Sequence, residues 1–254
     1  MPDGGSDAEV WRQRRTSFGS VAADYAAHRP GYPADAVTFL VGDRPRRVLD
    51  LGAGTGLLTG GLLAAGHEVV AVDPAEPMLA ELRARYPQVA THLGDAETVP
   101  LPDSSVDAVV AGQAAHWFAP EPAAVQLRRV LRPGGVVGLV WNTRDEEVPW
   151  VAALGRALAA EARGHEADRG VVDAFARALG ARVEHHRSGT VQRLRPEQVV
   201  AGIATRSYVA TMDDARRARF LGEVRAVLDT HPDTRGRHLV DLPYRTDAYR
   251  LTPT

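Results

Sequence analysis

A glycine-rich turn directly after a short apolar strand constrains the fold of this chain more than any other feature. Residues 50–56 read Asp-Leu-Gly-Ala-Gly-Thr-Gly and lie between the segment 47–49 and a helical stretch at 57–65. Because glycine has no Cβ, the backbone can turn tightly here and a ligand can approach it closely. A strand, a glycine turn and a helix in this order are typical of nucleotide-binding α/β folds.

The residues in and around the turn also limit which ligand it can take. Dinucleotide-binding turns follow the pattern G-x-G-x-x-G, but Leu57 stands where the third glycine belongs. Asp50 opens the turn, and a carboxylate there disfavours a doubly charged pyrophosphate. A Tyr-x-x-x-Lys pair is impossible as well, because the chain has no lysine. The pattern therefore favours a positively charged ligand over a nicotinamide dinucleotide.

Strand and helix patterns alternate along the chain. Near-continuous Val, Leu and Ala runs predict strands at 46–51, 68–72, 89–93, 106–111 and 136–142. Helices are expected at 10–27, 34–41, 57–65, 76–85, 121–131, 148–163, 170–180, 196–203 and 213–229, with a hairpin of 182–188 and 190–194 and a late strand within 238–250. Apolar runs of this kind indicate strands buried on both faces of a parallel sheet. The predicted fold class is a doubly wound α/β sheet with helices on both faces and a partly helical cap.

Composition excludes several kinds of chemistry. The absence of lysine rules out Schiff-base catalysis, and the absence of cysteine rules out disulfides, thiolate nucleophiles and Cys-based zinc sites. A formal charge of −2 gives no bulk attraction to nucleic acid or membrane surfaces. No apolar run reaches the roughly 18 residues of a transmembrane helix. We expect a cytoplasmic protein that acts on a small molecule, without nucleic acid or membrane as partner; the sequence does not indicate its oligomeric state.

Polar residues follow the ends of four successive predicted strands. They are Asp50, Asp73, Asp95 and Gln113. In open α/β sheets, ligands bind at the carboxyl ends of the strands. Asp73 lies about 20 residues after the glycine turn, where a carboxylate accepts hydrogen bonds from ribose hydroxyls. Asp95 could accept a hydrogen bond from the amine of an adenine. Each acid alone could also be a helix N-cap, but three at corresponding strand ends predict one nucleotide-type site.

These features resemble the class I S-adenosylmethionine-dependent methyltransferases. The resemblance rests on 50–56, on Val72-Asp73-Pro74 with Met78, on Gly94-Asp95-Ala96, and on the segment 129–135 before the fifth strand. It implies a Rossmann-like, seven-stranded sheet that binds S-adenosyl-L-methionine and releases S-adenosyl-L-homocysteine. In this family the glycine loop holds the methionine part, the second acid holds the ribose and the third reaches the adenine. The cofactor-binding residues so implied are Asp50, Gly52, Ala53, Gly54, Thr55, Gly56, Asp73, Pro74, Met78, Asp95, Ala96 and Gln113.

The segment 18–33 resembles one subgroup of this family, which includes trans-aconitate-type carboxyl methyltransferases. In that subgroup an N-terminal helix folds over the cofactor, with an aromatic or basic residue near the methionine carboxylate. Tyr25 and Arg29 are therefore further cofactor-binding candidates. His116 and Trp117 match the place where, in the subgroup, the substrate meets the methyl group.

The resemblance implies an in-line displacement, for which the enzyme mainly aligns the reacting atoms. A carboxylate acceptor is already ionised at neutral pH and needs no base. A hydroxyl or amine needs one, and His116 is the candidate catalytic residue for that role. The predicted function is O-methylation of a small molecule, with a carboxylate favoured and a hydroxyl next. Alternatives are C- or N-methylation of a secondary metabolite, an NAD(P)-dependent oxidoreductase, and a non-catalytic protein that binds S-adenosylmethionine.

Arginines are the residues expected to bind an acidic substrate, because a guanidinium binds a carboxylate bidentately. The candidates are Arg144, Arg206 with the nearby Tyr208, and Arg245. A metal is not expected. His185 and His186 are adjacent on a strand and point to opposite faces, and the acids at 145–147 serve the start of a helix as well as they would serve magnesium.

The expected domain organisation has four parts. Residues 1–35 form an N-terminal arm and lid helix, and residues 36–142 form the cofactor-binding core. Residues 143–235 form a helical cap over the substrate, with late strands. Residues 236–254 provide a C-terminal strand that completes the sheet.

Overall fold

The computed structural model describes residues 29–158, 166–206, 209 and 212–254. The chain divides into two compact units, and each is described by itself. The core unit comprises Pro30–Thr143, Gly164–Thr190 and Tyr244–Thr254, and the second unit comprises Met1–Arg29, Arg144–Arg163 and Val191–Pro243. The helix expected at 10–27 lies outside the described residues.

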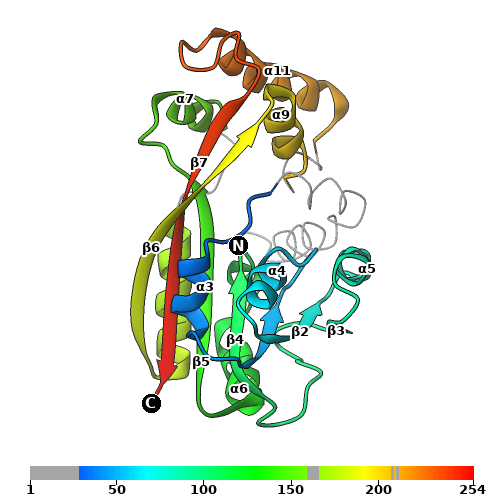
Figure 1. The fold of residues 1–254 in the computed structure, drawn as a ribbon, viewed down its shortest axis with the longest axis vertical. Coiled ribbons are helices and arrows are strands. Elements are labelled where there is room, and N and C mark those ends of the chain that lie inside the picture. The colour runs from blue at the N-terminus through cyan, green and yellow to red at the C-terminus, as the bar shows by residue number, and fades with distance from the viewer. Residues whose placement is uncertain (1–28, 159–165, 207–208, 210–211) are drawn as a thin grey trace, which may run out of the picture. The chain divides into compact units, whose positions relative to one another are not determined.

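A seven-stranded sheet lies at the centre of the core unit (Figure 1), in the order β3-β2-β1-β4-β5-β7-β6. Its strands are β1 (Arg47–Leu51), β2 (Glu68–Asp73), β3 (Ala90–Leu93), β4 (Val106–Gly112), β5 (Leu131–Arg144), β6 (Ala181–Leu194) and β7 (Val240–Pro253). Strands β1 to β5 pair in parallel, whereas β7 runs in the opposite direction to its neighbours (Figure 1). The predicted mostly parallel, doubly wound sheet is confirmed.

Helices cover both faces of this sheet, because successive strand residues point to opposite sides. Val69 and Ala71 pack with α3 (Ala34–Val41), α4 (Leu57–Ala64) and α5 (Glu76–Arg85). Val70 and Val72 belong to the core on the other face, together with α6 (Pro120–Val130) and α8 (Glu166–Leu179).

The strand order reverses between β1 and β4. In doubly wound sheets this reversal opens a crevice at the carboxyl ends of the two strands. The glycine turn follows β1, and a short 3₁₀ helix, η2 (Ala115–Trp117), follows β4. The topology thus brings the two segments that the sequence singles out to the same edge of the sheet.

The hairpin expected within 182–194 is wrong, because these residues form one continuous strand, β6. The predicted strands 182–188 and 190–194 left Gly189 between them at the expected turn. In the structure, a Cβ at Gly189 would lie 3.2 Å from the carbonyl oxygen of Tyr244 on β7. The glycine therefore allows close approach of a neighbouring backbone, which is its other common use inside a strand.

The second unit contains three described helices, α7 (Pro149–Leu158), α9 (Pro196–Ala204) and α11 (Asp214–Thr230). Helix α11 packs against both of the others. Their buried residues include Trp150, Leu154, Val199, Ile203, Phe220, Val224 and Leu228. Among the helices described in either unit, none is long and apolar enough to span a membrane.

Candidate functional site

The glycine turn is held against β2 and leaves one open position. The backbone N–H groups of Gly52 and Ala53 donate to the carbonyl oxygen of Val72, at 2.8 and 3.1 Å. Gly52, Gly54 and Gly56 all have positive φ, at 70°, 55° and 83°, so each position favours glycine. A Cβ on Gly52 would lie 2.6 Å from the Cβ of Ala114, whereas a Cβ on Gly54 would have no atom of the described residues within 4 Å. Among those residues, the backbone of Gly54 therefore borders open space.

Asp73, at the end of β2, is bonded to the turn and to the segment after it. Its Oδ2 accepts from Gly54 N at 2.9 Å, and its Oδ1 accepts from Ala75 N at 2.8 Å. Asp73 thus connects the glycine turn to Ala75. Its predicted contact with the ribose hydroxyls stays a prediction.

Asp50 lies beneath the turn and is only 1% exposed. Its Oδ2 accepts a hydrogen bond from the Thr59 hydroxyl at 2.6 Å. Burial, together with the nearby charge of Asp73 and despite the Thr59 hydrogen bond, raises the pKa of Asp50 to about 7. This hydrogen bond joins Asp50 to α4, and the predicted contact of Asp50 with the cofactor stays a prediction.

Three further predicted residues lie near the ends of β2 and β3. Asp95 accepts from the backbone and hydroxyl of Thr98, and both bonds use Oδ1. Ala96 and Met78 are buried, the latter in the first turns of α5. Within the described contacts of Asp95, Oδ2 is the oxygen that remains to meet a ligand.

The segment after β4 combines backbone strain with an aromatic contact. Gln113 has φ 57°, which is uncommon outside glycine, and its amide donates to the carbonyl oxygen of Asn142 at 2.6 Å. Helix η2 begins two residues after Gln113 and contains His116. The Nδ1 atom of His116 lies 3.5 Å from Nε1 of Trp141. The rings of His116 and Trp117 lie 5.0 Å apart. The strained turn thus presents His116 beside Trp141 of β5.

The described structure does not test five other predicted residues. Arg29, Arg144 and Arg206 belong to the second unit, and Tyr25 and Tyr208 lie outside the described residues. Their roles stay predictions.

Sequence reasoning missed a polar group where β5 and β7 meet. Asn142 accepts from the Thr246 hydroxyl at 2.6 Å and donates to the carbonyl of Gly31 at 3.0 Å. Both side chains are buried. An Asn inside an apolar strand pattern was the available signal, because a buried amide needs partners.

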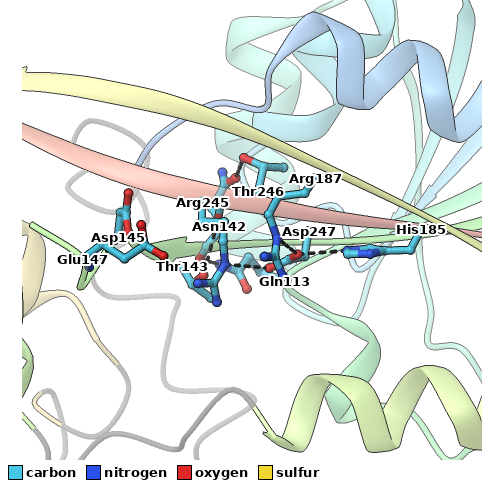
Figure 2. Close-up of polar contacts among 10 residues, drawn as sticks. All are labelled: Gln113, Asn142, Thr143, Asp145, Glu147, His185, Arg187, Arg245, Thr246 and Asp247. Carbon is cyan, nitrogen blue, oxygen red and sulfur yellow. Dashed lines mark hydrogen bonds and ion pairs between the residues drawn. The ribbon is translucent and has the colours of Figure 1, made fainter.

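A second polar group surrounds Asp247 on β7 (Figure 2). It contains His185, Arg187 and Arg245, all within hydrogen-bond distance of the Asp247 carboxylate. His186 instead faces Asp35 and Phe39 on α3, so the prediction that the two adjacent histidines point to opposite faces is confirmed. Of the three residues around Asp247, only Arg245 was a predicted substrate-binding candidate.

Comparisons with known proteins agree with this geometry. Residues 49–139 match the family described as a methyltransferase domain. An uncharacterised methyltransferase of Mycobacterium tuberculosis (strain ATCC 25618 / H37Rv) is 42% identical over 241 residues, covering 95% of this chain and 97% of the relative. A solved structure of a protein from Anaeromyxobacter dehalogenans, named as a type II methyltransferase, has a TM-score of 0.66 at 28% identity and covers 89% of this chain and 97% of that one.

A further relative is the malonyl-[acyl-carrier protein] O-methyltransferase of Methylococcus capsulatus. It is 39% identical over 147 residues, which are 53% of this chain and 54% of the relative. Taken with the near full-length match, these similarities show that the chain belongs to the class I S-adenosylmethionine-dependent methyltransferases. The family that the sequence resembles is thus confirmed, and the protein is an enzyme of this kind.

Proposed function

We propose that the glycine turn and the three strand-end acids bind S-adenosylmethionine in this chain. The open space at Gly54 supports a close approach of the methionine part to the backbone. Asp73, whose Oδ2 accepts from the turn at Gly54, is assigned to the ribose hydroxyls, and Asp95, whose Oδ1 accepts from Thr98, is assigned to the adenine amine. Burial raises the pKa of Asp50 to about 7, and the positive charge of a bound sulfonium cofactor would favour its ionised form. Tyr25 and Arg29 would close over the methionine end, as their subgroup resemblance implies.

We further propose that the methyl group goes to a carboxylate oxygen of a small molecule. The observation that carries this proposal is the contact between Trp141 and His116. Indole Nε1 is only a donor, so His116 Nδ1 accepts and the proton of the neutral ring lies on Nε2. The other end of His116 is then a hydrogen-bond donor, which suits a carboxylate oxygen and does not suit removal of a proton from a hydroxyl.

The reaction needs no proton acceptor in this case. S-adenosylmethionine, when bound, would supply the methyl group, and its sulfur would keep the electron pair of the carbon–sulfur bond. The carboxylate would become a methyl ester beside S-adenosylhomocysteine, so charge would balance without proton transfer. His116 positions the acceptor and does not act as the predicted general base. The malonyl-[acyl-carrier protein] O-methyltransferase name of one partial relative also supports an acidic acceptor.

Product chemistry tests this proposal. The enzyme is incubated with methyl-labelled S-adenosylmethionine and a panel of small acids, phenols, alcohols and amines, and release of S-adenosylhomocysteine is measured. We expect turnover with acids and a labelled product that mild alkali hydrolyses to methanol. An alkali-stable product, formed from a phenol, an amine or a carbon acid, would overturn the carboxylate proposal.

A further inference from the structure

One charged cluster of the core unit lies on the strands next to β5, whose Trp141 contacts His116, and it has no assigned role. The Asp247 cluster consists of Asp247 and Arg245 on β7 with His185 and Arg187 on β6 (Figure 2). Asp247 Oδ1 lies 2.9 Å from His185 Nε2 and accepts from Arg187 Nε at 3.0 Å. Its Oδ2 accepts from Arg245 Nε at 3.1 Å. One carboxylate therefore holds two guanidinium groups and an imidazole.

Aromatic contacts connect this cluster to His116. The ring of Tyr249 lies 6.1 Å from that of Trp141, measured between centroids. The ring of His185 stacks on Tyr249, with the two centroids 4.6 Å apart. Trp141 in turn contacts His116. Side chains two residues apart on a strand share a face, so Arg245 and Asp247 lie on the same face of β7 as Tyr249. The cluster and His116 are thus on one side of the sheet.

The strand order sets how far apart they are. Arg245 lies next to the end of β5, because its carbonyl oxygen accepts from the Thr143 hydroxyl at 3.3 Å. Strand β5 separates β7 from β4, the strand that leads into His116. Two strand spacings amount to about 10 Å. An arginine side chain and a small acceptor molecule together can span such a distance.

The four residues of the Asp247 cluster comprise two arginines, one carboxylate and one histidine. Their formal charges sum to +1 with His185 neutral. Although burial acts to raise it, hydrogen bonds from Arg187, His185 and Arg245 hold the pKa of Asp247 below its usual range. The Asp247 side chain is 14% exposed, whereas those of Arg245 and Arg187 are 30% and 59% exposed. Solvent therefore reaches the positive groups more than the negative one.

One arginine is enough to form a bidentate pair with a carboxylate. The same two strands carry a simple cross-strand pair in the second unit, where Arg193 binds Asp241 through Nε and a terminal nitrogen, at 2.7 and 2.9 Å. That pair is neutral and bidentate. In the Asp247 cluster, both arginines donate to the carboxylate through Nε. Asp247 therefore binds Arg245 along the side of its guanidinium group and orients its terminal nitrogens.

We propose that the Asp247 cluster is an anion-binding site, in which Arg245 and Arg187 bind a second anionic group of the methyl acceptor. This inference rests on the proposed carboxylate methylation, since the first anionic group is the reacting carboxylate beside His116. Asp247 positions the two guanidinium groups and does not contact the acceptor. The acceptor is then a small molecule with two anionic groups, and the second one is a carboxylate or a phosphate-like group.

Binding measurements on the complex with S-adenosylhomocysteine test the site without turnover. The probes are butyrate, glutarate and 4-phosphonobutyrate, which share a carboxylate and differ only at the far end. We expect glutarate or 4-phosphonobutyrate to bind more tightly than butyrate by calorimetry, and the tighter of the two identifies the second group. Loss of a charge-assisted bond in Arg245→Gln or Arg187→Gln should weaken that binding about tenfold to a hundredfold and leave butyrate unchanged.

Arg193→Gln is the matched control, because it removes a cross-strand arginine of the same strands outside the cluster. It should bind all three probes as the wild type does, and thermal unfolding checks that every variant is folded. Equal binding of the three probes to the wild type, or unchanged binding in both cluster variants, overturns the anion site. Because no methyl transfer is measured, the site can stand even if product analysis rejects carboxylate methylation, and it can fail while methyl esters still form.

Discussion

Replacing Gly52 and Gly54 separately with alanine distinguishes packing from ligand binding in the glycine turn. Both have positive φ, so each substitution costs about 1–2 kcal/mol in backbone strain. In Gly52→Ala the new Cβ would also lie 2.6 Å from the Cβ of Ala114. An alanine Cβ moves only with its backbone, so this overpacking adds about 1–3 kcal/mol. In Gly54→Ala the new methyl group meets no atom of the residues that the structure describes.

The two variants should therefore fail in different assays. Urea unfolding of the ligand-free protein should show a loss of about 2–5 kcal/mol for Gly52→Ala and about 1–2 kcal/mol for Gly54→Ala. Calorimetry with S-adenosylhomocysteine, at a temperature where both are folded, should show the larger loss of affinity for Gly54→Ala. If Gly54→Ala binds S-adenosylhomocysteine as tightly as the wild type does, the open space at Gly54 is not where the cofactor approaches.

Three other predictions concern buried polar groups. The pKa of Asp50 is raised to about 7 in the folded state, so the folded protein keeps a proton that the unfolded chain loses. The free energy of unfolding should therefore fall between about pH 4 and pH 7. Urea unfolding of Asp50→Asn should lack this contribution, and identical pH profiles of the two proteins would contradict it. Asn142→Ala leaves the buried Thr246 hydroxyl without its acceptor and should cost about 1–3 kcal/mol in urea unfolding, whereas no loss would refute the bond. Trp141→Phe removes the donor to His116 and should lower kcat/KM about threefold to tenfold; an unchanged kcat/KM would count against the contact.

The fold was predictable because its signals are local. Strands such as β2 are continuous apolar runs, and a polar residue lies at or near the carboxyl end of each of the first four. Helix α3 has the bounds that the sequence predicts. The prediction failed at β6, where Gly189 serves a neighbouring strand that lies far away in the sequence. No local pattern reveals such a contact.

The candidate site divides in the same way. Asp73 ends β2, the strand that follows the glycine turn in the sequence. The number of residues between them was therefore enough to predict that they belong to one site. The Asp247 cluster combines β6 and β7, and the contact from Asp247 to Arg187 joins residues 60 apart in the chain. The burial of Asp50 under α4 was also not evident, because the sequence does not say on which side of the turn its carboxylate lies.

The role of His116 decides the central claim that an ionised carboxylate is the methyl acceptor. His116→Gln keeps an N–H donor but cannot take up a proton, whereas His116→Ala removes both. With an acid acceptor, kcat/KM is measured from about pH 6 to pH 9 for the wild type and both variants. The proposed mechanism predicts a His116→Gln enzyme with most of its activity and the pH profile of the wild type, and an alanine variant that is about tenfold less active. Equal, large losses in both variants, with a wild-type rate that depends on deprotonation of the histidine, would contradict it.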